Sequence, residues 1–154
     1  MLALAGSTLA VFALAGCSAP VSTSPSAPAA DAPVASLDAA TADSSLGEII
    51  VDGEGMTAYF FNKDVANSGT SACVADCVAV WPAITTTSDT PTVTGITGTV
   101  GTITGAEGGK QITINGLPIY TFANDLAPGD VNGQGVKEVW YVVSPSGEKI
   151  TTAP

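Results

Sequence analysis

The chain has 154 residues, with 14 acidic side chains against four lysines, no arginine and no histidine, and a formal net charge of −10. This length bounds the chain to one domain, or to one domain with tails. The charge argues against a nucleic-acid partner, because neutralising phosphates requires clustered Lys or Arg. Without histidine the chain also lacks Ser-His-Asp and Cys-His nucleophile systems, histidine metal ligands and c-type haem attachment.

The N-terminal segment, residues 1–16, is an apolar run without a charged side chain. It is shorter than the ~20 residues of a transmembrane helix and fits the apolar part of a secretory signal peptide. The segment ends in Leu-Ala-Gly-Cys at 14–17, which resembles a bacterial lipobox. That resemblance implies cleavage before Cys17, a diacylglycerol on its sulfur and a lipid-anchored protein of the extracytoplasmic cell envelope. No Lys or Arg precedes the run, so we expect the natural start to lie upstream of Met1.

The next segment, residues 17–45, begins with the Cys that is expected to be lipidated. It contains little besides Ser, Ala, Pro, Thr and Asp. Such a composition has nothing large to bury and cannot offset the entropy of ordering the chain. We therefore expect a disordered linker that holds the domain away from the membrane.

The folded domain is expected at residues 46–154, where Thr, Val and Ile dominate stretches that alternate with polar residues. Such β-branched side chains favour strands. The expected strands are 48–51, 56–61, 99–104, 110–114, 117–122, 139–143 and 148–151. A short helical turn is expected at 72–80, and Asn115-Gly116 is the strongest hairpin signal. This pattern predicts an all-β domain, a small antiparallel β-sandwich or barrel.

The domain contains an internal repeat, with units at about 46–95 and 96–154. Three landmarks return in the same order: a Tyr, an Asp five residues later and a Trp. The pairs are Tyr59 and Tyr120, Asp64 and Asp125, each 61 residues apart, and Trp81 and Trp140, 59 residues apart. The near-equal offsets predict a pseudo-symmetric domain of two β units.

The repeated hexads carry a family resemblance. They are Tyr59-x-Phe61-x-x-Asp64 and Tyr120-x-Phe122-x-x-Asp125. They resemble the Tyr-x-(Phe/Trp/Tyr)-x-x-Asp motif of predicted bacterial lipoproteins known as secreted repeats of unknown function. Cys73-x-x-x-Cys77 followed by Trp81-Pro82, and the Gly-rich segment 128–135 before Trp140, also resemble that family. The resemblance covers residues 46–154 and implies an envelope lipoprotein, without supplying an activity.

The hexad residues have two interpretations. Tyr and Phe lie two apart on one strand and so face the same side, where they would fill the core. The Asp lies just past the strand and would accept backbone N–H bonds from the following loop. In the alternative, Asp64 and Asp125 lie near a common pseudo-twofold axis, where paired carboxylates could hold a cation or titrate together.

The cysteines other than Cys17 are Cys73 and Cys77. Outside the cytoplasm a nearby pair is most simply a disulfide, and spacing of four residues across a helical turn permits one. Redox activity or soft-metal binding stays open as the alternative, although the spacing differs from Cys-x-x-Cys and a zinc site needs four ligands.

The loop 124–135 alternates oxygen-bearing side chains at Asp130, Asn132 and Gln134, with Gly133 permitting a sharp turn. This pattern resembles the start of a calcium loop, but the twelfth position holds Tyr141 instead of the Glu of an EF-hand. The simpler interpretation is a turn network of Asx and Gly residues, and whether a metal binds stays open.

Two functions of different classes follow. The first is a non-catalytic binding or structural module, not an enzyme and without a cofactor, whose contact with the membrane is its lipid anchor. The sequence does not indicate whether its ligand is a protein or a small molecule. The second is a redox or metal-handling accessory protein of the envelope, built on the Tyr, Trp and Cys residues. A hydrolase working through carboxylates alone ranks last, because no spacing identifies such a pair.

Overall fold

The computed structural model describes residues 36–153. The expected signal peptide at 1–16, the lipidated Cys17 and the first part of the linker lie outside these residues. Within the described part, no helix is long and apolar enough to cross a membrane.

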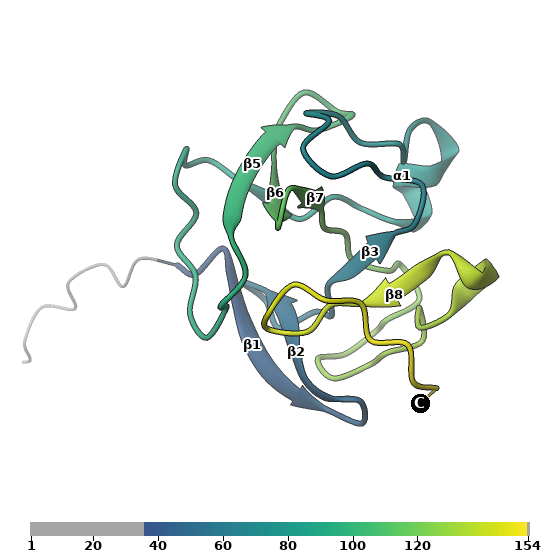
Figure 1. Ribbon diagram of the computed structural model, residues 1–154. Coiled ribbons are helices and arrows are strands. Elements are labelled where there is room, and N and C mark those ends of the chain that lie inside the picture. The colour runs from purple at the N-terminus through teal and green to yellow at the C-terminus, as the bar shows by residue number, and fades with distance from the viewer. Residues whose placement is uncertain (1–35, 154) are drawn as a thin grey trace, which may run out of the picture. The chain divides into compact units, whose positions relative to one another are not determined.

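The described chain is built from short antiparallel strands (Figure 1). The elements are β1 (Ala39–Ser44), β2 (Gly47–Asp52), β3 (Tyr59–Phe61), α1 (Asp76–Val80), β4 (Thr85–Thr86), β5 (Val100–Thr104), β6 (Lys110–Ile114), β7 (Leu117–Pro118), the 3₁₀ turn η1 (Val136–Glu138) and β8 (Trp140–Val142). They form three small sheets: β1 with β2, β3 with β8, and the order β4-β6-β5 with β7 also paired to β6. The expectation of an all-β, antiparallel domain is confirmed.

The first strand corrects the expected linker. The composition predicts a disordered linker through residue 45, but Ala39–Ser44 form β1 and pair with all of β2, from Ala39 opposite Asp52 to Ser44 opposite Gly47. The side chains of β1 are small, but its backbone hydrogen bonds are supplied by β2, and Ala39 is fully buried. The ordering of this segment therefore comes from a partner strand and not from large apolar residues of its own.

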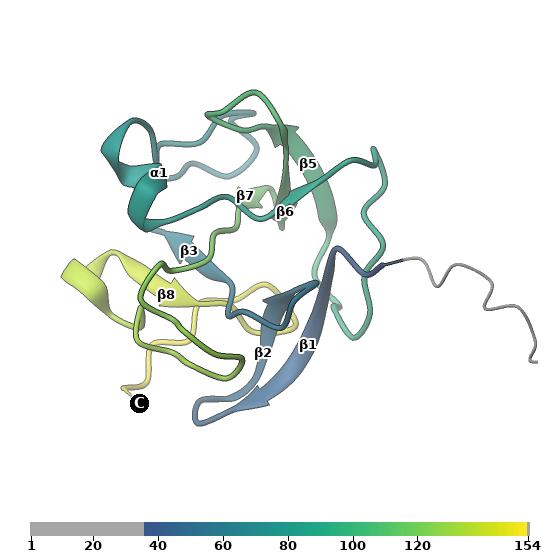
Figure 2. The ribbon, with the colours of Figure 1, turned by 180° about the vertical axis from the view of Figure 1, so that it is seen from behind.

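The core has two parts, separated by the alternation of side chains along β3. Phe60 packs with aliphatic residues of β2 and β6, among them Ile50, Ile112 and Ile114. Tyr59, the preceding residue, faces the other way into an aromatic cluster. Successive strand residues point to opposite faces, so one three-residue strand contributes to both halves of the core. Figure 2 shows β3 lying between the sheet that contains β6 and the strand β8.

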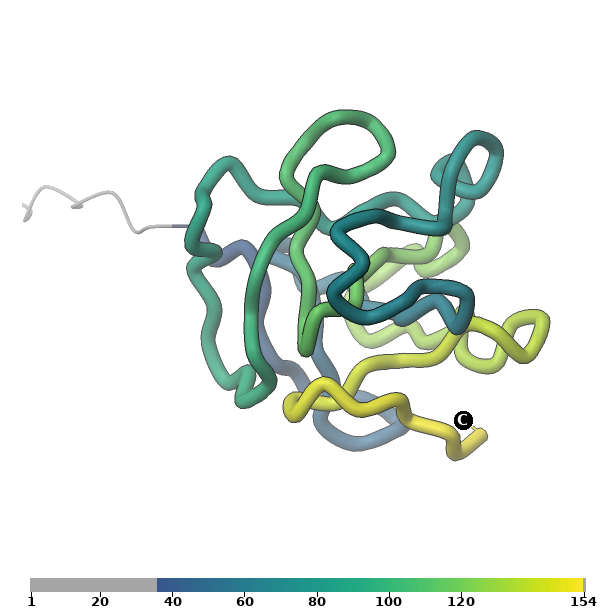
Figure 3. The backbone as a smooth tube through the Cα atoms, turned by 45° about the horizontal axis from the view of Figure 1, so that its top comes forward, coloured from purple at the N-terminus to yellow at the C-terminus, as the bar shows by residue number. Residues whose placement is uncertain are grey.

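The expected hairpin at Asn115-Gly116 is present between β6 and β7. Both residues have positive φ, 52° and 79°, as a two-residue turn of this kind requires. The preceding turn, 105–109, joins β5 to β6 at the edge of the domain (Figure 3).

The expected strands 56–61 and 117–122 are shorter in the structure, the first forming only at Tyr59–Phe61, and the expected strand 148–151 is absent. The segment 117–122 is a strand only at Leu117–Pro118, because the backbone N–H groups of Ile119, Tyr120 and Thr121 bond three different partners in turn. The segment 148–151 is not a strand and makes a single bridge, between Lys149 and Val143. The carbonyl of Ile150 instead accepts a bond from the side chain of Gln134.

Candidate functional site

The two repeats meet at their motif tyrosines. Tyr59 and Tyr120 form an antiparallel bridge, in which each backbone N–H donates to the other's carbonyl at 2.8 and 3.1 Å. Both residues are fully buried. The reciprocal pattern is that of a pseudo-twofold axis passing between the two residues, as the repeat predicts.

The side chains of the hexads are crossed between the repeats. The Tyr59 hydroxyl donates to Asp125 Oδ2 at 2.6 Å, and the Tyr120 hydroxyl donates to Asp64 Oδ2 at 2.8 Å. Each tyrosine therefore bonds the aspartate of the other hexad. Nothing in the sequence indicated this exchange, because the partners lie 66 and 56 residues apart.

The second oxygen of each aspartate bonds the loop that follows its own hexad. Asp64 Oδ1 accepts from the backbone N–H of Ala72 at 2.7 Å, and Asp125 Oδ1 accepts from that of Asn132 at 2.9 Å. The expected loop-bonding role of these aspartates is thus observed. Each carboxylate joins its own loop to the other repeat's tyrosine.

Burial raises the pKa of all four of these groups. Desolvation raises the pKa of both tyrosine hydroxyls far above the usual value, so they remain protonated donors. Desolvation also raises the pKa of Asp64 and Asp125, while the hydrogen bonds that each carboxylate accepts oppose that rise. In each pair, a neutral tyrosine hydroxyl therefore donates to a partly desolvated carboxylate.

Four aromatic rings, two from each repeat, form a continuous stack. The order is Phe61, Trp140, Trp81 and Phe122, with centroid separations of 4.2, 3.7 and 4.2 Å. The expectation that the Phe rings pack in the core near the tyrosines holds, but each Phe stacks on the Trp of the other repeat. The two ends differ, because Phe122 is buried whereas Phe61 is half-buried.

Cys73 and Cys77 form the expected disulfide, with their Cα atoms 5.2 Å apart. The bridge closes the segment that leads into α1. Cys73 is fully buried and belongs to the same core cluster as the aromatic residues, and Cys77 is half-buried.

The calcium-like loop uses its oxygens internally. Asp130 Oδ2 accepts from the backbone N–H groups of Leu126 and Ala127, and Gln134 Oε1 accepts from that of Val142. Asn132 donates to the carbonyl of Asn124. These bonds match the turn-network interpretation. Across residues 36–153, no three acidic or cysteine side chains gather as a metal site would require.

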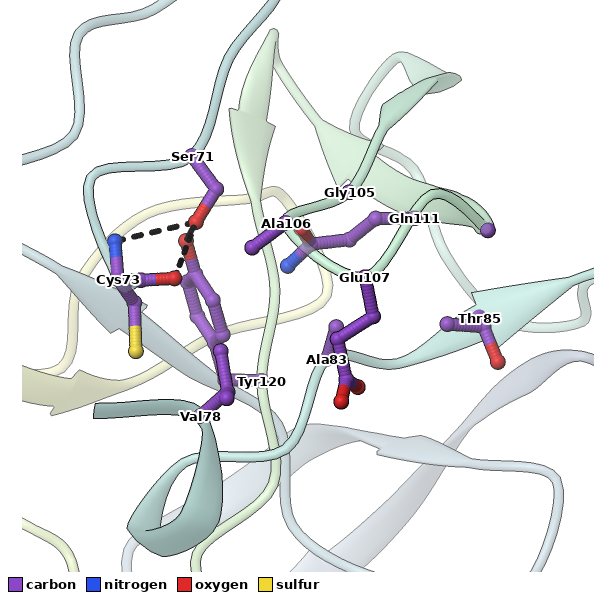
Figure 4. A pocket seen from close by; sticks show the side chains of 11 residues that line it. Ser71, Cys73, Val78, Ala83, Thr85, Gly105, Ala106, Glu107, Gln111 and Tyr120 are labelled. Carbon is purple, nitrogen blue, oxygen red and sulfur yellow. Dashed lines mark hydrogen bonds between the residues drawn. The ribbon is translucent and has the colours of Figure 1, made fainter. Parts of the chain in front are cut away.

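A pocket of about 240 Å³ lies beside Tyr120 (Figure 4). Its wall is part apolar and part polar, and it is bounded by the 105–109 turn. The side chains that matter below are Ser71, Cys73, Val78, Ala83, Glu107, Gln111 and Tyr120. Ser71 and Gln111 were not singled out from the sequence. Gln111 gave no signal, because it stands in a strand where an exposed polar residue would be ordinary, yet it is fully buried.

The matching position beside Tyr59 is closed. The backbone N–H of Gly133 donates to the Tyr59 hydroxyl at 3.2 Å, and a Cβ on Gly133 would come within 2.7 Å of the tyrosine ring. In the other repeat, the Tyr120 hydroxyl lies 2.8 Å from Ser71 Oγ. The two motifs therefore share their Tyr–Asp bonds but differ in what covers the tyrosine.

Comparison with family models matches two segments, residues 40–85 and 101–144, to one lipoprotein family described as a secreted repeat of unknown function. The chain belongs to that family. Comparisons with curated proteins and with solved structures gave no match. The two matched copies each contain one hexad, and the first copy begins within β1. A secreted lipoprotein family places the protein outside the cytoplasm.

Proposed function

We propose that this protein is a membrane-tethered, non-catalytic binding module of the cell envelope, and that its ligand occupies the pocket beside Tyr120. The observation that carries this proposal is the difference between the repeats. A duplicated motif that served only the core would have no need to leave one tyrosine beside a cavity of about 240 Å³. Small-ligand pockets combine apolar walls with a few placed polar groups, as this one does.

The membrane anchor in this proposal is a lipidated Cys17, the last residue of the lipobox at 14–17. One acyl chain alone binds a membrane weakly, so stable anchoring needs the two or three chains of a bacterial lipoprotein. Cys17→Ser should release the protein from the membrane fraction or leave it as an unprocessed precursor. Unchanged processing and membrane retention in this variant would rule the anchor out.

Filling the pocket tests the binding function. Ala106 lies at the pocket rim with an exposed side chain, so Ala106→Trp adds a ring there without replacing a core residue. Ala66→Trp, on an exposed loop, is the matched control. In a fragment screen by ligand-observed NMR on the full chain, we expect hits that Ala106→Trp removes and Ala66→Trp retains. Hits indifferent to Ala106→Trp, or no hits, would contradict the pocket as the binding site.

A redox accessory is the second candidate, and one observation favours it. Cys77 lines a surface cleft of about 330 Å³ together with Trp81 and Trp140. A redox-active pair would exchange with glutathione buffers, whereas structural disulfides typically stay oxidised down to about −300 mV. Equilibrating the protein in such buffers and alkylating free thiols distinguishes the two. Thiols that appear well above that potential would favour the redox role.

A further inference from the structure

The amide of Gln111 is half satisfied. Its side chain is fully buried, and its Nε2 donates to the carbonyl of Ile119 at 3.0 Å. Its Oε1 has no hydrogen-bond partner. Exchanging the two ends of the amide would place Oε1 against the carbonyl of Ile119, so two acceptors would face each other. The carbonyl of Ile119 therefore fixes the orientation and leaves the buried Oε1 as an unmatched acceptor on a residue that lines the pocket.

The neighbouring hydroxyls cannot satisfy this acceptor. Tyr120 donates its one proton to Asp64 at 2.8 Å, and Ser71 is within donating distance of the carbonyl of Cys73, at 3.1 Å. A buried acceptor without a donor is costly and rare in native structures. A donor from outside the chain would remove that cost.

The charge at the pocket is negative. Glu107 lines it, and Figure 4 shows its side chain between those of Ala83 and Thr85. The neighbouring Lys110 does not line the pocket, and its Nζ pairs with Asp89 at 2.7 Å. Because Lys110 and Gln111 are successive residues of β6, their side chains point to opposite faces.

The rest of the wall suits a short hydrocarbon. Val78, Ala83 and the buried Cys73 supply apolar surface. The 105–109 turn closes the pocket over Gln111, and three of its five residues are glycines. An added Cβ at Gly108 or Gly109 would meet no atom within 4 Å. The tip of the turn therefore has open space around these two glycines.

We propose that the pocket beside Tyr120 binds a primary ammonium group on a short apolar chain, with the ammonium donating to Gln111 Oε1 and pairing with the Glu107 carboxylate. This inference rests on the proposed binding function and names its ligand class. An ammonium offers three donors and no acceptor, which complements a site whose free groups are acceptors. A carboxylate ligand would meet Glu107 and an acceptor amide without a cation to pair with.

Isothermal titration of the full chain tests the assignment with three probes of similar shape: n-butylammonium, 1-butanol and butyrate. We expect n-butylammonium to bind, butyrate not to bind, and 1-butanol to bind at least ten-fold more weakly. Glu107→Gln should weaken n-butylammonium at least ten-fold, and Gln111→Met should abolish its binding. Glu48→Gln, an exposed residue of β2, is the control that should change nothing.

The outcomes separate this assignment from the binding function itself. The ammonium assignment is overturned if butyrate binds with the affinity of n-butylammonium. It is also overturned if Glu107→Gln binds n-butylammonium with full affinity. Glu107 is exposed, so this variant remains informative even if Gln111→Met fails to fold. If n-butylammonium does not bind, but other fragments bind and Ala106→Trp removes their binding, the binding function stands and the ligand class is wrong. If nothing binds, both proposals fall.

Discussion

The two hexads place the same Tyr–Asp pair in different surroundings. In each repeat, one backbone N–H of the loop bonds the aspartate, and the next residue of that loop lies near a tyrosine. This next residue is Gly133, beside Tyr59, in one repeat and Cys73, near Tyr120, in the other. Gly133 donates directly to the tyrosine hydroxyl. Cys73 donates instead to Ser71 Oγ, which bonds the hydroxyl in its place.

This difference explains why the pocket described above lies beside Tyr120, whereas Gly133 covers Tyr59. A glycine lets the backbone close directly onto the ring of Tyr59. In the other repeat, the Ser71 hydroxyl lies between the backbone N–H of Cys73 and the Tyr120 hydroxyl. The duplicated motif thus secures the interface between repeats, and the loop sequence after each hexad decides whether space remains for a ligand.

The largest expected difference between the repeats lies in the aromatic stack. Removing a buried Phe ring costs about 3–5 kcal/mol of unfolding free energy. We expect Phe122→Ala to lie in this range and Phe61→Ala to cost about half as much, because Phe61 is half-buried. Urea unfolding of both variants measures the two losses. Equal losses would mean that the two ends of the stack are energetically equivalent, as the repeat alone would predict.

The tyrosine hydroxyls should differ next. Tyr59→Phe leaves Asp125 Oδ2 without its donor in a site where Asp125 is only 5% exposed. Hydrogen bonds to charged groups contribute about 1.5–3 kcal/mol, so we expect a loss in that range. Tyr120→Phe should cost less, because Asp64 is more exposed and water can replace the lost donor. A larger loss in Tyr120→Phe would reverse the comparison.

Much of this arrangement could be predicted from residue patterns, because it is local. Strand 110–114 agrees with β6, and the hairpin at Asn115-Gly116 and the Cys73–Cys77 bridge follow from turn chemistry and spacing. The repeat also predicted matching tyrosines. These features depend on neighbours within a few positions of each other.

The rest depends on contacts between distant segments. The small residues of β1 give no core signal, since β2 supplies their order. The exchange of aspartates between hexads depends on how two similar units dock, which their common motif does not specify. Gln111 is buried because the 105–109 turn and Tyr120 cover it. The pattern of polar and apolar residues along β6 does not predict this burial.

Closing the space at Tyr59 further should be poorly tolerated. The added methyl of Gly133→Ala would lie 2.7 Å from the Tyr59 ring and 2.9 Å from Trp81. Overpacking of this kind costs about 1–3 kcal/mol. Ser71→Ala is the counterpart at Tyr120, and it removes a hydroxyl without adding volume, so we expect about 0.5–1.5 kcal/mol. Thermal and urea unfolding of both variants measures the difference. A neutral Gly133→Ala would show that the Tyr59 site has room after all.

The smallest expected effect is on the pH dependence of stability. Burial raises the pKa of Asp64 and Asp125 in the folded state, so the folded protein binds protons more readily than the unfolded chain does. The contribution of these two groups to stability should therefore rise as the pH falls through their raised folded pKa values, and level off below the unfolded value near 3.9. We expect the double variant Asp64→Asn, Asp125→Asn to lose this part of the slope, whereas Asp43→Asn, an exposed control on β1, keeps it. Melting temperatures from neutral pH to about pH 4 measure the slope. If the slope is unchanged in the double variant, the tyrosine and loop bonds offset the burial of the carboxylates completely, and the two aspartates titrate as they do in the unfolded chain.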